Sequence, residues 1–203
     1  MPNRQGIGDT AIAKKRLQWP AAFFAIRFHF IAAYLSAIHT KKHTGMKKLS
    51  SIGLDPSQSK KLTNKLNELL ANYSIFYQNT RGYHWNIKGE KFFELHLKFE
   101  ELYNDLLLKI DEIAERILTL GGTPQHNYSD YAKTSSVKES KQVSDGFEAV
   151  ADILHAFSKI MPLQRDILQL SADANDEGTN ALMSDYIRAQ EKLIWMYSAF
   201  LNK

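Results

Sequence analysis

Apolar side chains recur at steps of three and four residues along four long stretches of the chain, which is the period of an α-helix. The first stretch begins at Asp55-Pro56, because aspartate followed by proline is typical of a helix N-cap and the first helical position. It ends at the polar residues from Asn86 to Gly89. The second stretch starts near Lys91 and stops at Gly121-Gly122, since glycine is common where helices end.

Two more helices are predicted in the second half of the chain. The third starts at about Ser144 and contains Pro162, which removes a backbone hydrogen bond and predicts a kink. Residues 171–180, with the sequence SADANDEGTN, carry helix-capping side chains and predict a connection. The fourth helix takes the apolar positions from Leu182 to Leu201.

These elements predict an all-α fold. No stretch alternates apolar and polar residues with a period of two, so no sheet is expected. Four amphipathic helices favour a four-helix bundle. The connection between the second and third helices, 123–143, is longer than the usual turn of a bundle, and it has a candidate short helix around Ser129–Val137. A long crossover at this place is typical of ferritin-like bundles.

Composition narrows the chemistry. The chain of 203 residues has no cysteine, which excludes disulfides, thiolate metal sites and cysteine nucleophiles. This fits a reducing compartment, and we expect a cytoplasmic protein. The net charge of +4 is unevenly distributed, because residues 1–45 hold seven basic side chains and one acid. Residues 46–203 therefore hold 19 basic and 21 acidic side chains, a net charge of −2.

The N-terminal 45 residues are more basic than the rest of the chain and contain an apolar stretch, so we treat residues 1–45 as an extension separate from the domain. Arg27 and His29 interrupt the apolar part of this extension, which disfavours a membrane helix or a signal peptide. We expect an over-extended start, with the native chain beginning at Met46 and one domain covering 46–203. The alternative is a basic tail that binds DNA, and a mass measurement on the native protein separates the two.

Four residues supply candidate metal ligands: His84, His96, Asp111 and Glu115. Nitrogen and oxygen ligands without sulfur suit iron, manganese or zinc. Each histidine alone is more typical of a core residue. Asp111 and Glu115 lie four residues apart and share a helix face, and alone they are more typical of a surface cluster. The other members of such a surface cluster would be the neighbouring charged residues Lys109, Glu112 and Arg116.

The spacing of these candidates favours a site between two chains. His96 and Asp111 are fifteen residues apart, roughly 22 Å along one helix, whereas a metal ligand reaches only about 2 Å to its ion. The two residues point to nearly the same side of the helix, about 60° apart. If two copies of this helix pack antiparallel about a two-fold axis, His96 of one copy meets Asp111 and Glu115 of the other, and symmetry makes two identical sites.

The sequence lacks the motif of an ordinary ferritin centre. That centre uses Glu-x-x-His motifs inside one bundle, and this chain has none. Its nearest pattern is Asp152-Ile-Leu-His155 in the third helix, which has no matching partner on the other helices.

The stretch YHWNIKGEKFFELHLKFEELYNDLLLKIDEIAERILTLGGTP closely resembles the Dps family, the DNA-binding proteins from starved cells within the ferritin superfamily. DEGTNALMSDYIRAQEKLIWMYSAFL resembles the last helix of that family, and the likeness covers about residues 50–203. The resemblance implies a shell of twelve subunits built from two-fold dimers. It also implies iron sites where His84 and His96 face Asp111 and Glu115 of a partner. Such sites oxidise ferrous iron, preferentially with hydrogen peroxide, and the shell stores ferric oxide, which limits oxidative damage.

The resemblance suggests further roles. Trp85 matches a tryptophan beside the site that can donate an electron to a trapped radical, and its other interpretation is a core aromatic residue at the end of the first helix. Acidic side chains near the start of the last helix line iron-entry pores in this family, and the candidates here are Asp173, Asp176 and Glu177. Their other interpretation is helix capping.

The name of this family refers to DNA binding. Many members do not bind DNA, and those that do usually bind it through a lysine-rich terminus. From Met46 onward the candidate lysines are few: Lys47, Lys48, Lys60 and Lys61. Since counterion release needs several phosphate contacts, we expect weak or no binding from 46–203, and residues 1–45 would change that if native. The alternative function is a nucleoid protein that compacts DNA and binds iron secondarily.

Overall fold

The computed structural model describes residues 49–203, which form five helices and no strand. The helices are α2 (Pro56–Asn86), α3 (Phe92–Thr119), α4 (Tyr128–Thr134), α5 (Gly146–Asp173) and α6 (Glu177–Phe200). The all-α prediction is therefore confirmed for this part of the chain, as is the short helix in the crossover. The extension 1–45, the expected start at Met46, and the candidate lysines Lys47 and Lys48 lie outside the described residues.

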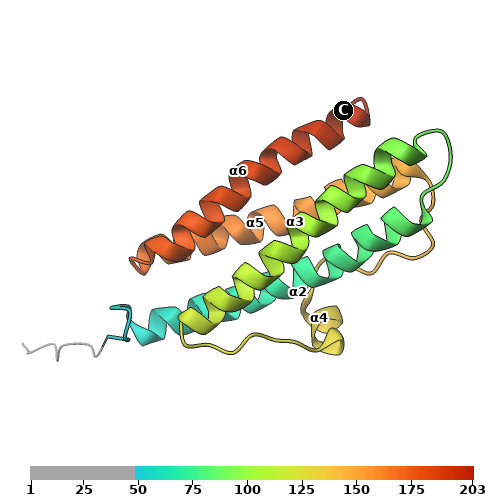
Figure 1. Cartoon of the computed structure of the whole chain (residues 1–203). Helices are drawn as coiled ribbons and strands as arrows, with labels where there is room; N and C mark the ends of the chain where they lie inside the picture. Colours follow the sequence, from blue (N-terminus) through green and yellow to red (C-terminus); the bar gives the residue numbers. More distant parts are fainter. Residues whose placement is uncertain (1–48) are drawn as a thin grey trace, which may run out of the picture. The chain divides into compact units, whose positions relative to one another are not determined.

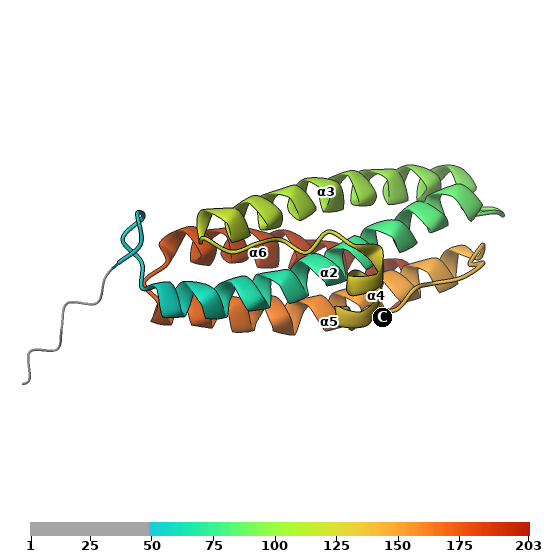
Figure 2. The same ribbon diagram turned by 90° about the horizontal axis from the view of Figure 1, so that it is seen from below.

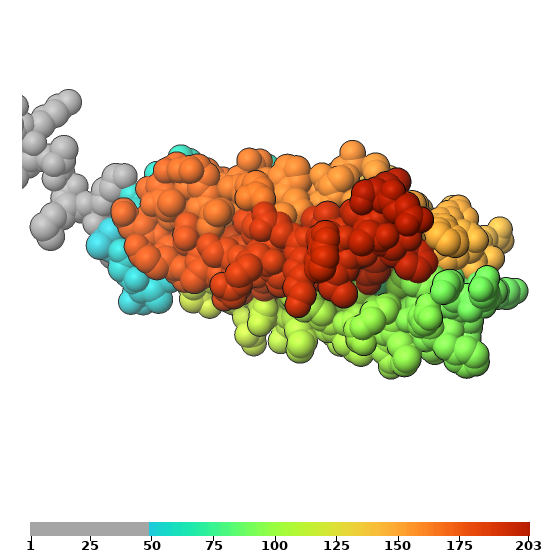
Figure 3. Space-filling view, turned by 90° about the horizontal axis from the view of Figure 1, so that it is seen from above, coloured from blue at the N-terminus to red at the C-terminus, as the bar shows by residue number. Residues whose placement is uncertain are grey.

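The four long helices form one bundle (Figure 1). Helix α3 returns antiparallel to α2, the crossover runs back along the bundle and carries α4, and α5 and α6 form a second antiparallel pair (Figure 2). Helix α2 contacts α3, α4 and α5. Helix α6 lies across the face shown in Figure 3, with α5 along one side and α3 along the other.

Local signals fix the ends of α2 and α3. The side chain of Asp55 accepts hydrogen bonds from the backbone N–H groups of Ser57 and Gln58, as expected of an N-cap followed by proline. Gly121 has φ +81°, in the left-handed region that glycine adopts without strain, and the chain leaves α3 there. Both predicted boundaries are confirmed.

The predicted connection 171–180 is wrong in length. Helix α5 continues to Asp173, and only residues 174–176 separate it from α6. The backbone N–H of Asp176 reaches back to the carbonyl of Ser171, while Asn175 takes a positive φ of 53°. The turn is therefore tight and uses its capping residues within a few positions. Helix α5 also continues through Pro162, which lies on its exposed side, where solvent reaches the backbone.

Large side chains from all four long helices fill the bundle. Tyr73 and Phe76 of α2, Phe99 of α3 and Phe157 of α5 are at most 1% exposed. The rings of Phe76 and Phe157 meet edge to face at 5.2 Å between centroids. These contacts join the two helix pairs into one core.

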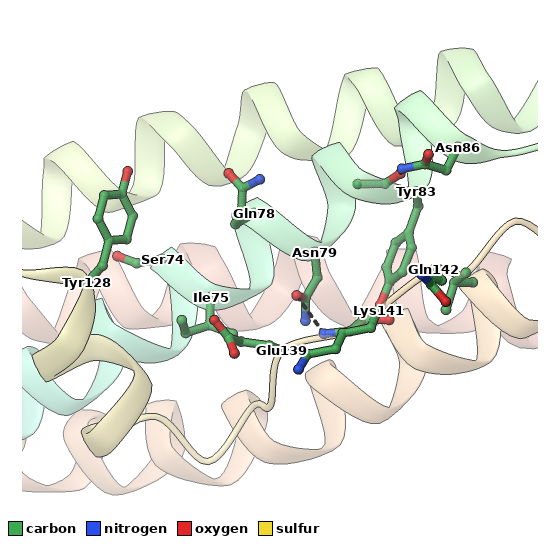
Figure 4. Close-up of a pocket in the computed structure, with 13 residues that line it drawn as sticks. Ser74, Ile75, Gln78, Asn79, Tyr83, Asn86, Tyr128, Glu139, Lys141 and Gln142 are labelled. Carbon is green, nitrogen blue, oxygen red and sulfur yellow. Dashed lines mark hydrogen bonds between the residues drawn. The ribbon is translucent and has the colours of Figure 1, made fainter.

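Three asparagines of α2 hold the crossover against the bundle. Asn67 donates to the carbonyl of Thr123 and accepts from the N–H of Gln125. Asn72 and Asn79 bind segments further along: the side-chain oxygen of Asn72 accepts from the backbone N–H groups of residues 136 and 137, and that of Asn79 from residue 140. Figure 4 shows the Asn79 contact beside a pocket of about 280 Å³ between α2 and the crossover. A long segment with little secondary structure is thus fixed by side-chain hydrogen bonds.

None of the helices in residues 49–203 combines the length and apolar character required to cross a membrane.

Candidate metal centre

His84 and His96 meet at the end of the bundle where α2 gives way to α3. His84 lies in the last turn of α2 and His96 in the second turn of α3. Their rings stack with 3.8 Å between centroids and an angle of 20° between planes. Nδ1 of His84 lies 2.8 Å from the carbonyl oxygen of His96, and Nδ1 of His96 lies 2.9 Å from the carbonyl oxygen of His84. The structure therefore brings together two of the four predicted ligands within one chain.

This reciprocal pairing determines which nitrogen of each ring is available. A carbonyl oxygen only accepts, so Nδ1 of each histidine must donate. Each neutral ring is then the Nδ1–H tautomer, with a lone pair on Nε2 for a metal. A histidine that ligates a metal usually donates its other ring N–H in this way. The His84 carbonyl, at the C-terminal end of α2, also gains a partner in a region where helical carbonyls lack one.

Aromatic side chains enclose the pair. Phe92 stacks on the His96 ring with 5.0 Å between ring centroids, and Tyr103 meets the His84 ring edge to face with 5.3 Å between centroids. Trp85 is 57% exposed, and the guanidinium of Arg81 lies 4.6 Å from its ring. Trp85 is therefore not a core aromatic residue of this chain, and it lies next to His84 in sequence, on the surface.

Asp111 and Glu115 lie exposed on α3, fifteen residues beyond His96. Neither carboxylate has a hydrogen-bond or ion-pair partner anywhere in residues 49–203. No group of three or more histidine or acidic side chains within that range could enclose an ion. Within residues 49–203 the two histidines and the two carboxylates thus form two separate groups.

The surface-cluster interpretation of Asp111 and Glu115 does not fit the observed pairing. Lys109 pairs with Asp105, and Arg116 pairs with Asp176 at the start of α6. Glu112 accepts a hydrogen bond from the hydroxyl of Tyr186 on α6. Each neighbouring charge is engaged elsewhere, which leaves the two carboxylates without a counter-ion from residues 49–203.

The three pore candidates differ from one another. Asp176 is 2% exposed and caps α6, accepting from the N–H and hydroxyl of Thr179 as well as from Arg116. Its carboxylate is therefore engaged in capping, the second of the two interpretations. Asp173 and Glu177 are exposed, and Asp173 accepts a hydrogen bond from Gln169.

The interior of the bundle does not resemble an ordinary ferritin centre. One of its buried polar groups is the hydroxyl of Tyr73, which accepts hydrogen bonds from Gln164 and Gln190. Burial, more than any other influence, raises the pKa of this hydroxyl above its ordinary value. Asp152 of the Asp-x-x-His pattern accepts from Tyr83 and Ser140 instead of facing a second ligand pair. These groups are hydrogen-bonded packing elements, which agrees with the missing motif.

The sequence patterns did not reveal the mutual hydrogen bonds of His84 and His96, because these depend on how α2 and α3 are rotated against each other. Their separation of twelve residues across a predicted helix break was the only signal. The structural role of Asn67, Asn72 and Asn79 was also missed, since single asparagines inside a helix carry no pattern.

Comparison with known proteins adds independent information. A family model for the ferritin-like domain matches residues 63–203. The "DNA protection during starvation protein" of Porphyromonas gingivalis is 41% identical over 159 residues, which is 78% of this chain and 100% of that protein. An uncharacterised protein of Haemophilus influenzae is 55% identical over 150 residues, 74% of this chain and 94% of its own.

A solved structure is similarly close. The crystal structure of a Dps protein from Vibrio cholerae O1 is 57% identical, has a TM-score of 0.75, and covers 78% of this chain and 99% of that one. It is described as a member of a broad superfamily of ferritin-like diiron-carboxylate proteins. The likeness thus extends over the whole length of that relative.

Proposed function

The chain belongs to the Dps family of ferritin-like proteins, and from this premise we propose that it oxidises ferrous iron at sites between subunits and stores the ferric product. The observation that carries the proposal is the division of ligands into two half-sites. His84 and His96 are fixed with Nε2 available, while Asp111 and Glu115 have no partner within residues 49–203. A two-fold dimer of antiparallel α3 helices would join the halves, with His84 and His96 of the partner subunit facing the carboxylates.

The ligand types suit the reaction. Two carboxylates balance the charge of a divalent ion and, as hard oxygen donors, favour the ferric state that forms on oxidation. Hydrogen peroxide takes up two electrons and two protons to give two molecules of water, and two ferrous ions each give one electron. Peroxide consumed in this way releases no hydroxyl radical. We propose peroxide as the preferred oxidant.

Trp85 is proposed as an electron donor. It would reduce a single-electron oxidant that forms when peroxide is not reduced by two ferrous ions together. It follows His84 directly in sequence, and its ring is 57% exposed in the single chain. The ring is therefore accessible from solvent in the single chain.

We propose that the subunits form a hollow shell of twelve, built from the two-fold dimers, in which ferric oxide collects in the cytoplasm. Asp173 and Glu177 are the exposed acids next to the α5–α6 turn and are the proposed lining of the iron entry. Asp176 is left out of this role because its carboxylate is buried and paired.

The test is stopped-flow oxidation of ferrous iron by peroxide and by oxygen, run on the intact assembly alongside native mass analysis. The variant Asp111→Ala/Glu115→Ala removes both carboxylates. It should slow oxidation by more than about 10- to 100-fold, which is the usual effect of losing a residue that only supports a metal ligand. A matched control, Asp166→Ala/Glu148→Ala, removes two exposed acids from α5 and should oxidise iron at the wild-type rate. Wild-type kinetics in the first variant would refute the site.

A second candidate function is DNA protection by binding, favoured by the name of the P. gingivalis relative. The net charge of −2 on residues 46–203 argues against strong binding by the helical domain. Gel retardation at increasing salt tests this. Retardation that the domain alone retains above physiological salt would favour the second function.

A further inference from the structure

The proposed reaction places a demand on the number of ligands. Two ferrous ions must lie together to deliver both electrons to one peroxide, and two-metal sites hold their ions about 3.5–4 Å apart. His84, His96, Asp111 and Glu115 supply only four side chains for two ions. Within residues 49–203, one further histidine lines a pocket together with Asp111, namely His126.

The backbone around His126 is anchored on both sides. Its predecessor Gln125 donates its N–H to Asn67 at 2.7 Å, and the Gln125 carbonyl accepts from the hydroxyl of Tyr131 at 2.7 Å. Its successor Asn127 is the N-cap residue of α4. The position of His126 is therefore set by α2 and α4, although the residue lies in a connecting segment and its ring is exposed.

His126 and Asp111 line the same pocket. This pocket of about 440 Å³ lies between α3 and the crossover, and apolar groups such as Ile110, Ala114 and Pro124 form much of its wall. A few polar groups converging in a mostly apolar pocket are typical of a ligand site. Neither side chain has a hydrogen-bond partner within residues 49–203, so both are available to a metal.

We propose that His126 is a fifth protein ligand of the metal centre and holds a second divalent ion together with Asp111. This inference rests on the proposed function of Asp111 and Glu115. Asp111 then bridges two ions: one bound also by Glu115 and the histidines of the partner subunit, the other bound by His126. Water molecules complete the coordination shell of the second ion. His126 and Asp111 give that ion only two protein ligands, fewer than a closed site requires.

The test counts ions without using the oxidation reaction. The intact assembly is dialysed against Co²⁺ under nitrogen, bound metal is counted by elemental analysis, and the visible absorption of Co²⁺ reports its ligands. Wild type should bind two ions per subunit, and His126→Ala should keep only one, with a smaller and shifted absorption. His126→Asp, which restores a ligand of another type, should recover the second ion.

His155→Ala is the matched control, since His155 is exposed on α5 and does not line this pocket; it should bind two ions. An unchanged count and affinity in His126→Ala, or a single ion in wild type, would overturn the inference. These outcomes leave the proposed function untouched, because that fails only if Asp111→Ala/Glu115→Ala still oxidises iron at the normal rate.

Discussion

A buried ion pair between α3 and α6 gives a stability prediction with a calculable size. Asp176 accepts hydrogen bonds from Arg116 and from both the N–H and the hydroxyl of Thr179, and Arg116 also donates from Nε to that hydroxyl at 2.8 Å. The side chains of Asp176 and Arg116 are 2% and 18% exposed. The guanidinium packs over Gly178, where an added Cβ would lie 2.9 Å from Nη1. We choose Asp176→Asn, since asparagine has the same shape and is an equally good N-cap; the exchange removes the charge and replaces one acceptor oxygen by an NH2 donor.

The expected loss follows from the buried, unpaired Arg116 that remains. Breaking a buried ion pair by removing one partner costs about 3–5 kcal/mol. Arg116 retains some contact with water, so we expect the lower end, about 3 kcal/mol. For a chain of this size each kcal/mol corresponds to about 2–4 °C, so Tm should fall by about 6–12 °C.

The assay is thermal unfolding followed by circular dichroism at a single protein concentration, because the stability of an assembly depends on concentration. Asp185→Asn is the control, since its pair with Arg188 is mostly exposed and should change Tm by only about 1–3 °C. Arg116→Met/Asp176→Asn replaces the charges on both sides and should recover much of the loss. A fall in Tm for Asp176→Asn that stays within the control's range of about 1–3 °C, or a double variant no more stable than the single one, would show that the pair is not the source of stability.

Two further predictions concern buried polar groups. Asn72→Ala leaves the N–H groups of Ser136 and Val137 without their acceptor, and the free energy of unfolding in urea should fall by about 2 kcal/mol; an unchanged midpoint would contradict the anchoring role. Burial raises the pKa of Tyr73, so the unfolded chain releases this proton near pH 10 (about the ordinary value) while the folded chain keeps it. The contribution of this group to the free energy of unfolding is fully present below that pH and falls above it by up to about 1.4 kcal/mol per pH unit. In urea titrations at roughly pH 10 to 11, the free energy of unfolding of Tyr73→Phe should therefore fall less steeply with pH, by up to about 1.4 kcal/mol per pH unit.

The helices were predictable from the sequence wherever one local signal dominated. Asp55-Pro56 is the single signal for the start of α2, and Gly121 is the signal for the end of α3. The structure confirms both boundaries. The connection between α5 and α6 was predicted too long because 171–180 contains several residues that can cap a helix. The cap is Asp176, which is also the residue that pairs with Arg116 from α3, sixty residues away along the chain. Such a contact between distant segments is not visible in a local pattern.

The separation of the candidate metal ligands was predictable, since helical rise alone prevents His96 and Asp111 from meeting in one chain. The orientation of the imidazoles was not, because it depends on each ring bonding to the backbone of the other helix. The part played by His126 depends similarly on Asn67 and Tyr131, which fix the path of the crossover. The sequence thus indicated candidate ligands by residue type, while contacts between helices determine how their side chains are oriented.

The pairing of the cations on α3 leaves Asp111 and Glu115 without a competing lysine or arginine, as the proposed metal site requires. A lysine or arginine beside a carboxylate competes with a divalent metal for the same oxygens. Lys109 and Arg116 flank the pair in sequence, but Lys109 bonds to Asp105 one turn earlier, and Arg116 is held by Asp176. Because both cations have acidic partners of their own, neither neutralises Asp111 or Glu115, and no other cation in the described part of the chain does so. The same ion pair that stabilises the start of α6 therefore also keeps Arg116 away from the exposed carboxylates.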